Sequence, residues 1–168
     1  NGANQDVITT APSDRHFREV AISPEGNQLV ALTIGSDMYD SEIYLMNRDG
    51  SNQKVLIDSL DGIVQSPSWS IEGNFILFTH DVSGNESGNG RLFNSHIKKL
   101  TNVNQASPDT TDLSHNKEPG YNDRHPVYSP TGSKILFVRA PNNKPNDTEI
   151  WIMDADGSNR EMLVEHGN

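Results

Sequence analysis

The chain has 168 residues, a formal net charge of −10 and 33% hydrophobic residues, with no cysteine to form disulfides or thiolate metal sites. Its apolar residues stand in groups far shorter than the roughly 20 consecutive residues of a membrane span, so we expect no transmembrane segment. Phosphate backbones repel an acidic surface, and this disfavours nucleic acid as a partner.

The first strand signal is the segment DVITT, residues 6–10, which resembles the closing strand of a preceding or partner repeat unit. A first unit, about residues 17–58, follows it. Its turn SPEG pairs a proline that presets φ with a glycine that accepts a positive φ, and its turn NRDGSN suits a bulged hairpin at Gly50. Its four strands are expected at 20–22, 28–34, 42–47 and 54–57.

The second unit, about residues 64–101, is degenerate. It repeats a short strand at 67–69, the turn SIEG and an apolar strand at 74–80. Its third and fourth strands are expected within 91–101, where the Asp-Gly turn is missing. The polar residues 102–122 are predicted to form an insertion loop, and loops of that length are usually functional or mobile.

The third unit, about residues 123–165, returns to the pattern of the first. It has the turn SPTG before its most apolar strand and the turn DADGSN before its last strand. Its strands are expected at 126–128, 134–139, 149–154 and 161–164.

Four antiparallel strands repeated in this way predict an all-β fold, a β-propeller of four-stranded blades that forms a single domain over 1–168. A blade buries both faces of its sheet only by stacking on neighbours. Because closed rings typically need at least four blades, three units leave two open flanks. The chain is therefore a partial ring, or half of a six-bladed ring completed by a second copy, or it meets its missing blades in a partner.

The repeat resembles that of the TolB-type β-propellers, in the segments EIYLMNRDGSNQKVL, PSWSIEGNFILFT and HPVYSPTGSKILFV with EIWIMDADGSNREML. The resemblance implies proteins of the bacterial periplasm or cell surface, usually with six blades. In TolB the propeller is a docking surface for proteins. Similar repeats occur beside prolyl oligopeptidase-like peptidases and in sugar-acid lyases that hold a metal, so the resemblance indicates the fold more strongly than the function.

Two triplets are candidate contact sites, Asp14-Arg15-His16 and Asp123-Arg124-His125. The resemblance places them where one blade passes to the next, near the axial channel, so they could converge on a ligand or partner. Arginine can hold a carboxylate, and histidine can move protons. The alternative, which we favour, is structural: the aspartates cap loops and the arginines tie blades together. Val64-Gln65-Ser66 stands there in the second unit and breaks a full ring of ligands.

No catalytic residue, cofactor or metal site is predicted. The acids of DADGSN fit a hairpin turn better than a calcium loop, since glycine is absent from the sixth position. Nucleophile elbows, phosphate loops and paired metal ligands are also missing from the sequence. The sequence therefore predicts a non-catalytic module for protein interaction or assembly, periplasmic or extracellular, with its signal already removed. The alternative is the substrate-binding propeller of a hydrolase or metal-dependent lyase.

Overall fold

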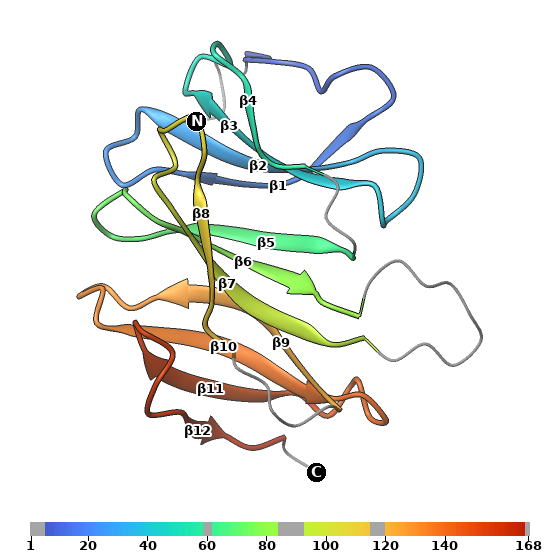
Figure 1. Ribbon diagram of the computed structural model, residues 1–168, viewed down its shortest axis with the longest axis vertical. Helices are drawn as coiled ribbons and strands as arrows, with labels where there is room; N and C mark the ends of the chain where they lie inside the picture. Colours follow the sequence, from blue (N-terminus) through green and yellow to red (C-terminus); the bar gives the residue numbers. More distant parts are fainter. Residues whose placement is uncertain (1–5, 59–61, 84–92, 115–119, 167–168) are drawn as a thin grey trace.

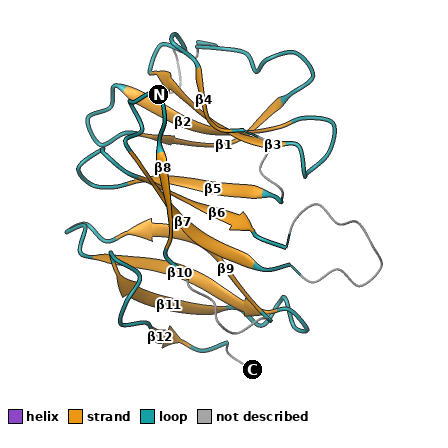
Figure 2. Cartoon of the chain, viewed as in Figure 1, coloured by secondary structure: helices purple, strands orange, loops and turns teal. Residues whose placement is uncertain are grey.

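The computed structural model describes residues 6–58, 62–83, 93–114 and 120–166. Within these ranges the chain forms three antiparallel sheets of four strands and no helix, stacked one below the other in Figures 1 and 2. It thus offers, in its described part, no helix that could cross a membrane. In each sheet the strands pair in chain order, and over the described residues the three sheets do not close into a ring. This confirms the predicted all-β partial propeller of three four-stranded blades.

The first blade, at the top of Figure 1, contains β1 (His16–Ile22), β2 (Gln28–Ile34), β3 (Ser41–Asn47) and β4 (Lys54–Ile57). The second contains β5 (Val64–Trp69), β6 (Ile76–Asp81), β7 (Ser95–Thr101) and β8 (Asp109–Asp112). The third contains β9 (Tyr121–Tyr128), β10 (Lys134–Pro141), β11 (Glu149–Asp154) and β12 (Glu161–Val164).

The outer part of the second blade differs from the sequence prediction. Residues 95–101 form the single strand β7, and the fourth strand, β8, lies inside the segment 102–122 that was expected to be an insertion loop. β8 has the sequence Asp-Thr-Thr-Asp, and it pairs with β7 from Lys98↔Asp112 to Thr101↔Asp109. An edge strand held mainly by backbone hydrogen bonds needs no apolar pattern, and this is why the sequence did not reveal it. Residues 115–119 of that segment lie outside the described residues.

The N-terminal segment 6–10 forms no strand with any described part of the chain, and its predicted pairing is with a preceding or partner blade. It nevertheless lies against the first blade: a Cβ added to Gly50 would be 2.3 Å from the Ile8 carbonyl oxygen. A Cβ added to Gly157 would be 2.6 Å from the Leu113 carbonyl oxygen. Ile8 therefore lies against the β3–β4 turn of the first blade in the same way that Leu113, the residue after β8, lies against the β11–β12 turn of the third blade.

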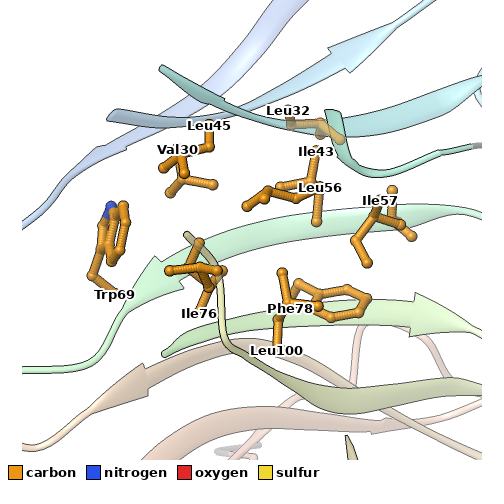
Figure 3. Packing of buried hydrophobic residues seen from close by; sticks show 12 residues of the cluster. Val30, Leu32, Ile43, Leu45, Leu56, Ile57, Trp69, Ile76, Phe78 and Leu100 are labelled. Carbon is orange, nitrogen blue, oxygen red and sulfur yellow. The ribbon is translucent and has the colours of Figure 1, made fainter. Parts of the chain in front are cut away.

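Successive residues of the second strand in a blade point to opposite faces of the sheet, so they pack against different neighbouring blades. Ile76 and Phe78 of β6 face the first blade, and Leu77 between them faces the third. The cluster between the first two sheets appears in Figure 3, where Val30, Leu32, Ile43 and Leu45 lie above Trp69, Ile76, Phe78 and Leu100. The cluster between the second and third sheets contains Leu77, Ile97, Leu113, Ile135, Phe137 and Met153. The middle blade is therefore buried on both faces.

Two blade faces remain without a covering blade among the described residues. We call the face toward the preceding unit the leading face and the opposite face the trailing face. Leu29, Ala31, Tyr44 and Met46 form a separate buried cluster on the leading face of the first blade, beside the exposed Val20. An apolar hollow of about 180 Å³ lies on this face, lined by Ile8, Thr9, Phe17, Val20, Leu29, Ala31 and Met46.

The trailing face of the third blade follows from register. Leu136 holds the position of Leu77 after the turn and pairs with Val127 and Ile152. Val138 pairs with Ile150 in the next row. Val127 and Ile150 are 50% and 42% exposed. Apolar strand residues thus point away from the only blade that packs on this sheet among the described residues.

Candidate functional site at the inner strands

The first strand of each blade lies on the inner side of the arc, with β5 against both β1 and β9. The pairing register shifts within all three strands: between Phe17 and Glu19 in β1, between Gln65 and Ser68 in β5, and between Arg124 and Val127 in β9. In the second and third blades the bulge residue has a left-handed backbone, with φ of 54° at Ser66 and 53° at His125. The Ser66 Oγ lies 2.9 Å from the His125 Nδ1 and links these two strands.

The two Asp-Arg-His triplets do not occupy equivalent positions. Asp14 lies nine residues before the turn serine of its blade, Ser23, whereas Asp123 lies six residues before Ser129. Asp14 stands in an exposed turn before β1, but the whole second triplet lies inside β9. The position that corresponds to Arg124 is Arg18 in the first blade and Gln65 in the second. The structure therefore does not bring the two triplets together in one ring.

Arg15 is engaged within its own blade. Its Nη1 donates to the Asp40 Oδ1 at 2.7 Å, its Nη2 to the Asp40 carbonyl at 2.8 Å, and its Nε to the Thr33 Oγ1 at 2.9 Å. The hydrogen bond from Arg15 lowers the pKa of Asp40. The Arg15 guanidinium thus ties the β2–β3 connection to β2. The next residue in the chain, His16, is exposed.

Asp123 is completely buried and collects three donors from other segments. Its carboxylate accepts hydrogen bonds from the Arg139 Nε at 2.7 Å, the Ser114 Oγ at 3.0 Å and the Arg160 Nη1 at 3.3 Å. The Arg139 guanidinium also stacks 4.7 Å from the Trp151 ring centre. Because these partners satisfy the carboxylate inside the fold, Asp123 has a structural role.

Arg124 stands in a different environment, at a small pocket between the inner strands. Its guanidinium lies 5.7 Å from the Phe93 ring centre, and none of the described residues accepts a hydrogen bond from it. Burial lowers the pKa of Arg124, and the negative charge of Asp81 opposes that shift. The pocket has a volume of about 150 Å³ and is lined by Met38, Ile63, Gln65, Thr79, Asp81, Phe93, Ser95 and Arg124.

Sequence reasoning identified Arg124 but none of the other pocket residues. Gln65, Thr79 and Phe93 come from β5, β6 and the segment before β7, and no motif joins them. A signal for Gln65 was present, because counting five residues back from Ser70 and from Ser129 aligns it with Arg124. The bulge residue next to each, Ser66 or His125, is found by the same count.

The turn DADGSN closes the β11–β12 hairpin, as predicted. The Gly157 amide donates to the Asp154 carbonyl at 2.9 Å, and Gly157 has a φ of 90°. The Asp154 carboxylate accepts from Lys134 and Asn159, both at 2.6 Å. The side chains of this turn therefore stabilise the hairpin itself.

Comparisons with known proteins were made by sequence and by structure. No family model matches the chain. The Tol-Pal system protein TolB of Anaeromyxobacter dehalogenans is 32% identical over 124 residues, which cover 73% of this chain and 24% of that protein. The chain thus spans about a quarter of the length of the curated TolB relatives that it matches.

Two solved structures illustrate the likeness in fold. A structure from Agrobacterium tumefaciens named as a TolB protein has a TM-score of 0.69 at 23% identity, over 94% of this chain and 51% of that one. An oligogalacturonate lyase in complex with manganese has a TM-score of 0.64 at 14% identity, over 94% of this chain and 44% of the lyase. At these identities the likeness concerns the fold alone.

Proposed function

The chain belongs to the TolB-like β-propeller repeats, and we propose that it acts as a non-catalytic module for protein interaction and assembly. Three curated relatives are named Tol-Pal system protein TolB, which supports a role within a multiprotein assembly. By the same relationship we propose that it works in the bacterial periplasm or at the cell surface.

The observation that carries this proposal is the pair of uncovered apolar blade faces. In the middle blade, Leu77 is buried because Ile135 and Phe137 of the third blade pack against it. Leu136 occupies the same position in the third blade, where no described strand covers it. Exposed apolar surface of this kind is typical of an interaction site. The occupant that matches it in shape and period is another blade.

We propose that a second copy of the chain supplies that blade. Two half-rings related by a twofold axis make two identical contacts, each between the trailing face of one third blade and the leading face of the partner's first blade. Such an assembly closes a six-bladed ring and leaves no open flank.

Light scattering at micromolar concentration tests the assembly. The unaltered chain should have twice its single-chain mass of 18.6 kDa, while Val20→Glu and Ile150→Glu should have the single-chain mass. Ile71→Glu is the matched control, because Ile71 is also exposed (46%) but lies in the β5–β6 turn, away from both flanks. A monomeric unaltered chain, or flank variants that remain dimeric, would contradict ring closure by a second copy.

The alternative function is the substrate-binding propeller of a hydrolase or metal-dependent lyase. It is favoured by the Arg124 pocket and by the fold that the chain shares with the manganese-bound oligogalacturonate lyase. Metal content after purification and thermal shifts with Mn²⁺ or galacturonate test it. Absence of both metal and shift would remove this alternative.

A further inference from the structure

We propose that the pocket at Arg124 binds a carboxylate group of a protein partner, supplied by an acidic side chain or by a chain terminus. This inference rests on the proposed interaction function and names the chemistry by which the module would recognise its partner. It is carried by two polar groups in the pocket that lack partners within the described chain.

The first group is the Arg124 guanidinium. A guanidinium offers five N–H donors in a planar fork that fits a carboxylate in bidentate fashion. Arg15, Arg139 and Arg160 each donate to an aspartate inside the fold. Arg124 is half-buried, and among the described residues its guanidinium contacts the face of Phe93 and donates to no aspartate. Its donors are thus held in a partly dehydrated site, oriented by the ring and available to an acceptor.

The second group is the Thr79 hydroxyl. Thr79 is 2% exposed and lines the pocket, and its Oγ1 has no hydrogen-bond partner among the described residues. Buried hydroxyls in folded proteins are nearly always hydrogen-bonded. A ligand oxygen in the pocket, with small adjustments of the Thr79 rotamer, would give this hydroxyl an acceptor.

The size and charge of the pocket favour a carboxylate over other anions. A volume of about 150 Å³ equals the share of about five waters in the liquid, enough for a carboxylate and one or two methylenes. Met38 and Ile63 supply apolar contacts for those methylenes. Asp81 lines the same pocket, and its negative charge disfavours a doubly charged phosphate.

The charge of Asp81 does not disqualify the site for a single negative charge. The Asp81 Oδ1 accepts hydrogen bonds from the Ser83 amide, the Ser83 Oγ and the Asn94 amide, at 3.1, 2.6 and 2.9 Å. These three donors from its own hairpin stabilise the negative charge locally. The Asp81 carboxylate is therefore already hydrogen-bonded within the protein. The N–H donors of Arg124, in the same pocket, are available for a ligand carboxylate.

Three small probes separate the sources of the carboxylate. N-acetyl-glutamic acid α-amide carries only the side-chain carboxylate, N-acetyl-glutamine carries only the terminal one, and N-acetyl-glutamine amide carries neither. Titrations of the ¹⁵N-labelled full chain would follow the Arg124 Nε–H signal. One or both carboxylate probes should shift that signal saturably, with a dissociation constant on the order of 1–10 mM, and the neutral probe should not.

Variants of the full chain identify the group that binds. Arg124→Met should weaken binding at least tenfold, and Thr79→Val, which preserves shape, should weaken it severalfold. Arg18→Met is the matched control, because Arg18 holds the corresponding place on β1 but is exposed and lies outside the pocket. It should bind as the unaltered chain does.

Equal shifts by the neutral probe, no shift of the Arg124 signal at saturating probe, or unchanged binding by Arg124→Met would each overturn the inference. If Arg124→Met does not fold, the response of the Arg124 signal in the unaltered chain decides. The result is separable from the assembly test. A monomeric chain that binds the probes would support this inference and contradict ring closure. A dimer that does not bind the probes would support ring closure and contradict this inference.

Discussion

Replacing Asp123 with asparagine tests whether this carboxylate holds the third blade together. Asp123 is fully buried, and both arginines that donate to it are largely buried, with 12% and 18% of their side chains exposed. Asparagine keeps the shape of the side chain but leaves both guanidinium groups without their countercharge. Removing one partner of a buried ion pair costs about 3–5 kcal/mol, and we expect the free energy of unfolding to fall by that amount.

The loss is measurable by urea denaturation at one fixed protein concentration, followed by tryptophan fluorescence. With an unfolding entropy of about 2.1 cal/mol/K per residue, the same loss lowers Tm by roughly 9–14 °C for this chain. Asp14→Asn is the control, because Asp14 is exposed and its φ of 65° suits asparagine equally well. If Asp123→Asn costs no more than Asp14→Asn, the structural role assigned to Asp123 is refuted.

Two further substitutions test other contacts. Gly157→Ala should destabilise the chain more than Gly120→Ala, although both glycines have positive φ (90° and 124°), because only at Gly157 would the new Cβ meet a backbone oxygen; equal losses in urea would contradict that close approach. Burial alone would raise the pKa of Asp112, but hydrogen bonds from His96 and Lys98 hold it well below its usual range. Asp112→Asn should therefore reduce stability at pH 7, and the difference from the unaltered chain should vanish as the pH falls from about 4 toward the folded-state pKa. A difference in the unfolding midpoint that is constant from pH 7 to pH 2 would contradict this assignment.

Much of the fold could be predicted from local sequence. The turns SPEG, SIEG and SPTG place Gly26, Gly73 and Gly132 at φ values of 73°, 70° and 72°, as the turn chemistry requires. The apolar runs after them form β2, β6 and β10, since a strand covered on both faces must be apolar along its whole length. Two independent local signals, a turn and a buried run, therefore fix the repeat.

The rest could not be predicted, because it depends on contacts between distant segments. The triplets around Arg15 and Arg124 have the same sequence, Asp-Arg-His. Measured from the turn serine of each blade, however, their positions differ by three residues. The pocket needs side chains from five separate segments, and Thr79 gives no local sign that its hydroxyl lacks a partner. Long-range geometry of this kind leaves no periodic trace in one sequence.

The burial of the middle blade on both faces has a consequence for how the chain opens. In stacked repeats, the stability of each unit includes the interfaces with its immediate neighbours. Backbone amides of β6 should therefore exchange with solvent most slowly, while the first and third blades open in partial unfolding events. A partner that docks on either flank would be detected first as slower amide exchange in an end blade, with the smallest change in the middle.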